Sequence, residues 1–100
     1  AMKTMTISDI RKKVIPILKK EGVLKAAIFG SYATGYADPK SDIDFLIQMN
    51  KNKSLFDLAG LKIDLEEKLG KKVDVLTYKG IHPLLRRRIL GEKITIYEKK

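Results

Sequence analysis

The sequence predicts an α/β domain in which a small mixed sheet of about four strands is flanked by helices. Short apolar runs alternate with segments whose apolar residues recur every three or four positions, an alternation typical of α/β folds. The first two predicted strands are joined by residues 30–41 alone, too few for a helical crossover between parallel strands. We therefore expect these two strands to be antiparallel, which disfavours a Rossmann fold.

A first helix is predicted from Ile7 onward, because five apolar residues lie on one helical stripe. Thr6 and Asp9 have the spacing of a capping box at its start. Gly22 can adopt the left-handed conformation after its end, and Pro16 should kink or split it. The stripe consists of Ile7, Ile10, Val14, Ile17 and Leu18.

Two further helices carry similar boundary signals. Ser54 and Asp57 repeat the capping-box spacing, and Gly70 follows the last apolar position of the second helix. Pro83 suits the first turn of a short third helix, after which we place Gly91. The core-facing positions of the second helix are Leu58, Leu61, Leu65 and Leu69.

Four apolar runs bounded by turn residues are predicted to be strands, namely residues 25–29, 43–49, 72–77 and 94–97. Between the first two, Asp38-Pro39-Lys40-Ser41 has proline where a type I turn favours it. Residues 30–41 should therefore form a loop with one short helical turn.

Composition limits the function classes. We expect one domain over residues 1–100, with Ala1 an expression scar, because a chain of this length supports a single core. Its net charge of +9 favours anionic partners such as nucleotides, RNA or acidic proteins. There is no cysteine and no apolar run long enough to cross a membrane. We therefore expect a cytoplasmic protein with no membrane partner.

The stretch that indicates chemistry begins with Gly30-Ser31 and ends, ten residues later, with Asp42-Ile43-Asp44. Side chains alternate along a strand, so the two carboxylates should project to the same side about 6 to 7 Å apart. Carboxylates at this spacing can share magnesium, which completes its shell with water and phosphate oxygens. Glycine lets the backbone approach an anion, and a helical turn at Ser31 would direct N–H groups at it.

Asp74 is the third candidate acid. It lies between two valines in the third predicted strand, where a buried carboxylate is costly unless it is paired or bound to metal. If that strand neighbours the one with Asp42 and Asp44, the three acids form a cluster whose repulsion divalent ions would relieve.

At these residues the chain resembles the nucleotidyltransferase superfamily related to DNA polymerase β, and within it the minimal nucleotidyltransferases, small proteins often encoded beside HEPN toxins. The resemblance implies the polymerase β-like catalytic core, two Mg²⁺ ions on Asp42 and Asp44, and a third carboxylate at Asp74 that helps activate the acceptor hydroxyl. Gly30 and Ser31 would bind the nucleotide phosphates. One departure is Thr34, where many relatives carry arginine.

The resemblance further implies transfer of AMP from ATP to a tyrosine of a cognate HEPN toxin, which would make the chain an antitoxin. A second hypothesis is a binding module that neutralises a partner by docking, motivated by Thr34 and the small size. A third is an RNA-binding domain, motivated by the +9 charge.

Other conspicuous side chains favour structural roles. His82 should start a helix, and the Arg86-Arg87-Arg88 run is typical of a solvated face. Tyr32 and Tyr36 could border the nucleotide or cover the edge of the sheet.

Overall fold

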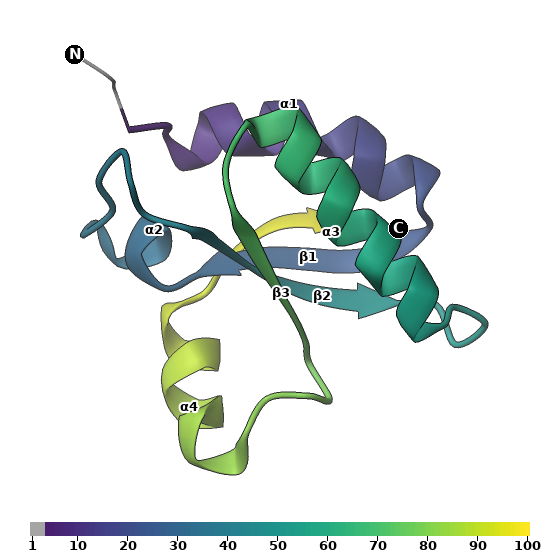
Figure 1. The fold of residues 1–100 in the computed structure, drawn as a ribbon. Helices are drawn as coiled ribbons and strands as arrows, with labels where there is room; N and C mark the ends of the chain where they lie inside the picture. The colour runs from purple at the N-terminus through teal and green to yellow at the C-terminus, as the bar shows by residue number, and fades with distance from the viewer. Residues whose placement is uncertain (1–3) are drawn as a thin grey trace.

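The computed structural model describes residues 4–100, and Ala1, the expected expression scar, lies outside them. Figure 1 shows a sheet between two helical layers. Along the chain the elements are α1 (Ile7–Lys20), β1 (Val23–Phe29), α2 (Ser31–Thr34), β2 (Ile43–Met49), α3 (Leu55–Leu69), β3 (Val73–Thr77), α4 (Pro83–Glu92) and β4 (Ile94–Glu98).

The sheet has four strands in the order β3-β2-β1-β4. Strand β1 is antiparallel to both of its neighbours, β2 and β4, whereas β2 and β3 are parallel. Helix α3 provides the crossover that the parallel pair requires. The mixed α/β fold and the antiparallel pairing of the first two strands are therefore confirmed.

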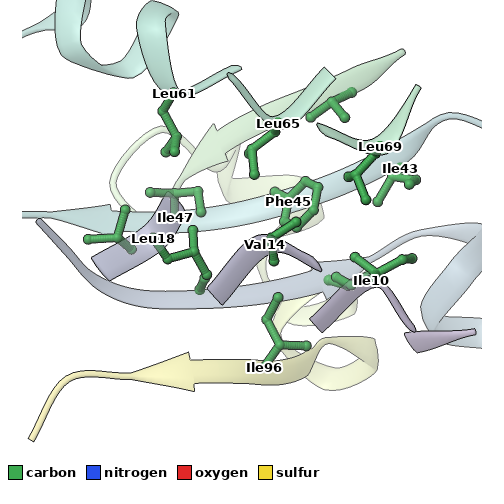
Figure 2. Close-up of a cluster of buried hydrophobic side chains, with 14 of the residues drawn as sticks. Ile10, Val14, Leu18, Ile43, Phe45, Ile47, Leu61, Leu65, Leu69 and Ile96 are labelled. Carbon is green, nitrogen blue, oxygen red and sulfur yellow. The ribbon is translucent and has the colours of Figure 1, made fainter. Parts of the chain in front are cut away.

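Helices α1 and α3 cover one face of the sheet, and α4 covers part of the other (Figure 1). The main core lies under α1 and α3, where their apolar stripes meet the side chains of β2 (Figure 2). A smaller cluster under α4 contains Ala27, Leu46, Ile81 and Ile89. The side chains labelled in the main core are Ile10, Val14, Leu18, Leu61, Leu65, Leu69, Ile43, Phe45, Ile47 and Ile96.

Alternation along β2 decides where its acid points. Ile43, Phe45 and Ile47 enter the main core, whereas Leu46 belongs to the cluster under α4. Asp44 has the parity of Leu46, so its side chain lies on the α4 side of the sheet. The carboxylate of Asp44 therefore lies on the face of the sheet opposite to the main core.

Helix boundaries mostly follow the predicted signals. Capping boxes form at Thr6 and at Ser54, and both Gly22 and Gly70 have positive φ after their helices. Helix α1 continues through Pro16, which is exposed, so of the two expected outcomes, a kink or a split, the split is wrong.

Two other boundaries differ from the prediction. Gly91 lies inside α4, which ends at Glu92, and it lacks the positive φ of a residue that follows a helix. Strand β1 begins at Val23, two residues earlier than predicted, because Val23 is buried in the main core and pairs with Met49. No helix within residues 4–100 combines the length and hydropathy of a membrane span.

Candidate functional site

The site begins where β1 ends. Gly30 has φ 73° and ψ −150°, a backbone conformation that is essentially restricted to glycine. Its carbonyl oxygen accepts hydrogen bonds from the N–H groups of Ala33 at 3.0 Å and Thr34 at 3.1 Å. These bonds form the short helix α2, which confirms the predicted helical turn in the loop.

Asp44 lies directly against this turn. It pairs with Phe29 across the antiparallel strands, one residue before Gly30. A Cβ atom added to Gly30 would overlap Oδ2 of Asp44 and would lie 3.2 Å from its Cγ. Glycine is therefore required at position 30 for two reasons, its backbone conformation and the close approach of a carboxylate.

The parallel pairing of β2 and β3 brings the third acid alongside. Asp44 and Asp74 are register partners, and the proximity of Asp74 contributes to the raised pKa of Asp44. Asp42 precedes β2 and is half-buried, and its charge also acts on Asp44. The structure thus places Asp74 beside Asp44, with Asp42 close enough for its charge to act on Asp44.

The premise that Asp74 is buried is wrong. Its side chain is exposed, because β3 is an edge strand and Asp74 points to the face that α4 covers only in part. Asp44, in the second strand of the sheet, is half-buried, as is Asp42. The cluster therefore has an inner carboxylate beside Gly30 and an outer one that faces solvent.

The electrostatics of the cluster centre on Asp44. Burial raises the pKa of its carboxyl to about 6, and the charge of Asp74 contributes next. Repulsion from Asp42 and Glu92 adds to the effect. The ionised form of Asp44 is thus disfavoured by its burial and by the neighbouring carboxylates.

Glu92 is a site residue that sequence reasoning missed. Its Oε1 accepts a hydrogen bond of 3.2 Å from the backbone N–H of Gly30, across 62 positions of the chain. In the sequence, Gly91-Glu92-Lys93 resembles an ordinary helix exit. The contact would have been expected only if two things were known: that Glu92 lies in the last turn of α4, and that the following strand, β4, pairs with β1.

The residues present fit magnesium. No three His, Cys, Asp or Glu side chains within residues 4–100 form a metal site by themselves. Magnesium, however, usually takes one or two protein carboxylates and draws its remaining oxygens from water and phosphates. A divalent cation would also relieve the repulsion that raises the pKa of Asp44.

The other conspicuous residues fall outside the cluster. Tyr32 is buried in the main core, whereas Tyr36 is 85% exposed. His82 is the N-cap of α4 and accepts from the N–H of Leu84, which confirms its structural role. Arg86, Arg87 and Arg88 are exposed, as predicted for a solvated face.

A separate groove of about 940 Å³ lies at the opposite end of β2. It is lined by apolar residues and four lysines but by none of the acids. The molecule is therefore electrostatically divided, with carboxylates where β2 begins and ammonium groups where it ends. The lysines are Lys25, Lys51, Lys53 and Lys79.

The raised pKa of Asp44 predicts that Asp44→Asn stabilises the ligand-free protein. Because the pKa is near 6 in the folded state and 3.8 ordinarily, the stability that protonation of Asp44 provides is complete below pH 4 and is lost as pH rises through 6. Asparagine imitates the protonated form. We expect a gain of about 1 kcal/mol at pH 7.5, well below the full value of the shift because Asp44 is only half-buried.

Urea denaturation in EDTA at pH 7.5 and pH 4 measures this difference. The gain should vanish at pH 4, where the wild-type carboxyl is protonated in the folded state, and the cap residues whose pKa is lowered, Asp9 and Asp57, are common to both proteins. A variant less stable than the wild type at pH 7.5 would show that the ionised carboxylate is not under strain.

The comparisons with known proteins agree with this geometry. Residues 12–100 match the family Polymerase beta, Nucleotidyltransferase, so the chain belongs to that family and is a nucleotidyltransferase. A Methanocaldococcus jannaschii relative named "putative protein adenylyltransferase" is 55% identical over 92 residues, which cover 92% of this chain and 99% of the relative. Protein adenylyltransferase MntA of Thermococcus cleftensis is 29% identical over 100 residues, which cover 95% of this chain and 100% of the relative.

Solved structures place the chain more narrowly among minimal nucleotidyltransferases. One described as a "putative minimal nucleotidyltransferase" has a TM-score of 0.77 and 34% identity, with 90% of this chain and 95% of the other covered. A toxin–antitoxin complex with AMP-PNP has a TM-score of 0.76 at 20% identity, covering 90% and 74%. The complex of a tri-AMPylated Shewanella oneidensis HEPN toxin with MNT antitoxin has a TM-score of 0.69 at 17% identity, with 90% of this chain and 71% of the other covered. The last two are likenesses of fold.

Proposed function

We propose that this nucleotidyltransferase transfers AMP from ATP to a tyrosine hydroxyl of a HEPN-type partner protein and thereby acts as an antitoxin. The observation that carries the proposal is the packing of Asp44, paired with Asp74, against the glycine turn that follows β1. The names of the relatives, which include protein adenylyltransferases, support the reaction. The toxin–antitoxin complexes among the structural neighbours support the kind of partner.

Under this proposal residues 1–100 act as a single minimal domain, in which Asp42, Asp44 and Asp74 hold two Mg²⁺ ions. Bound magnesium would supply the positive charge that activates the acceptor oxygen and stabilises the pyrophosphate leaving group. The acids suit this role because their mutual repulsion favours a divalent cation.

The chain's own groups divide the remaining work. Gly30 allows the triphosphate to approach the backbone closely, and the hydroxyl of Ser31 donates to a phosphate oxygen. The acceptor oxygen bonds to the α-phosphorus as the bond to the bridging oxygen breaks and pyrophosphate leaves. The exposed Asp74 accepts the hydroxyl proton, since it is the acid that an acceptor arriving from solvent would reach first.

The proposal predicts that label reaches the acceptor from the α-phosphate of ATP and not from the γ-phosphate. The measurement incubates the protein and a HEPN-type partner with Mg²⁺ and with ATP labelled at either position, followed by mapping of the modified tyrosine. Label from the γ position would indicate a kinase. Omission of Mg²⁺ serves as the control and should leave the acceptor unlabelled.

A second candidate function is neutralisation of a partner by docking without transfer. It is favoured by Thr34, whose hydroxyl lies 3.1 Å from the carbonyl oxygen of Gly30 and so bonds to its own helical turn. No cationic side chain is available from this position to bind a phosphate. Tight binding of the partner without label from either position of ATP would support this function.

A further inference from the structure

Glu92 occupies an unusual place at the end of the ladder between β1 and β4. The paired residues of these strands include Ile28 with Ile94, and α4 ends just before β4 begins. Two residues beyond Ile28, just past the end of β1, comes the N–H of Gly30. A partly buried side-chain carboxylate, from Glu92, satisfies it at 3.2 Å.

The same glycine forms the wall against which the inner acid packs. Oδ2 of Asp44 occupies the space that a Cβ of residue 30 would take. The position of the Gly30 peptide therefore limits where the Asp44 carboxylate can lie. Glu92, Gly30 and Asp44 form a continuous line of contacts from the end of α4 to the acid cluster.

A fourth carboxylate near three others is electrostatically unfavourable, and Glu92 does contribute to the repulsion on Asp44. An apolar or amide side chain would avoid that cost. A carboxylate, however, makes a stronger, charge-assisted hydrogen bond to a backbone N–H than a neutral acceptor does. The placement is consistent with a need to hold the Gly30 peptide firmly.

We propose that Glu92 is a positioning residue for nucleotidyl transfer, which acts through its hydrogen bond to Gly30 to fix the Gly30-Ser31 turn relative to Asp44. The inference rests on the proposed function for its catalytic consequence. The hydrogen bond carries the effect, and the negative charge of Glu92 contributes only by strengthening that bond. Glu92 touches neither the nucleotide nor the acceptor in this role.

Three variants separate the bond from the charge. Glu92→Gln keeps an oxygen acceptor at the same reach but removes the charge, Glu92→Asp keeps the charge but is one methylene too short, and Glu92→Ala removes both. We expect kcat for AMP transfer to fall about 10- to 100-fold in the Asp and Ala variants, as for loss of a partly buried hydrogen bond. The Gln variant should lose no more than about fivefold, as for a neutral bond in place of a charged one.

Hydrogen exchange of the Gly30 amide in the ligand-free proteins provides a readout that does not depend on activity. Protection should be lost in the Asp and Ala variants and retained in the Gln variant. Glu67→Ala, an exposed acid on α3, is the control for loss of a carboxylate. A Gln variant as impaired as the Ala variant, or an Ala variant with wild-type kcat, would overturn the inference.

Failure of the proposed function is distinguishable from failure of this inference. If the wild type transfers no label, the proposed function fails, and binding of Mg²⁺ with ATP to the same variants tests the positioning role alone. Affinity should then fall about tenfold in the Asp and Ala variants only. Equal affinity in all variants would overturn the inference, as would loss in the Gln variant. If the Ala variant does not fold, the Asp and Gln pair gives the same comparison.

Discussion

Asp44→Asn is expected to abolish most nucleotidyl transfer, with a loss of about 10³-fold, while the chain remains folded. The variant removes the inner carboxylate of the cluster but keeps its size and its capacity to hydrogen bond with Asp74. Charge at the reacting centre is the largest single contribution that such sites make to catalysis, and a preorganised group there typically changes the rate by about 10² to 10³. Transfer of label from the α-phosphate of ATP, measured beside circular dichroism, checks both parts of the prediction.

The matched control is Asp64→Asn, which removes one negative charge from α3 on the other side of the sheet. It should leave transfer unchanged. Asp42→Asn should resemble the Asp44 variant in activity, because both acids are proposed to hold magnesium. Full activity in either site variant would contradict the metal assignment, and simultaneous loss in the control would point to a general effect of charge.

Gly30→Ala is expected to be nearly as damaging, with a loss of transfer of at least about 10²-fold, since a displaced catalytic group commonly costs that much. The added methyl group would overlap Oδ2 of Asp44, so either the acid or the turn has to move. The backbone conformation of Gly30 adds strain of about 1 to 3 kcal/mol for any other residue. Activity assays and urea denaturation together measure the two effects.

Gly35→Ala separates the steric effect from the backbone effect. Gly35 also has positive φ, at 85°, but a Cβ at this position meets nothing within 4 Å. We expect a loss of stability of about 1 kcal/mol and little change in transfer. If both glycine variants lose activity equally, overlap with Asp44 is not the reason that glycine is needed at position 30.

Most of the fold follows from local signals that the sequence displays. The capping boxes at Thr6 and Ser54 and the glycines after α1 and α3 determine helix ends by short-range hydrogen bonds and backbone conformation. Such signals can be recognised without knowing the tertiary structure. Gly91 shows their limit, because α4 continues through it to Glu92, and the N–H of Lys93 still donates to the carbonyl oxygen of Ile89.

The site was predictable where strand pairing was implied by loop length. The short loop required β1 and β2 to be neighbours, which brings Gly30 beside Asp44. No comparable signal in the sequence indicates that β3, which carries Asp74, pairs with β2. The exposure of Asp74 could not be predicted either, because it depends on β3 being an edge strand. Glu92 was beyond prediction, because its contact with Gly30 joins residues 62 positions apart without a repeating pattern.

The pairing of the strands has a consequence for the order in which the protein matures. Gly30 and Asp44 lie in a hairpin that can close early, whereas Asp74 joins them only after the whole of α3 has crossed over the sheet, and long-range contacts of this kind form slowly. Glu92 is later still along the chain. The three acids would therefore come together only in the last stage of folding, after the hairpin that carries Gly30 and Asp44 has closed.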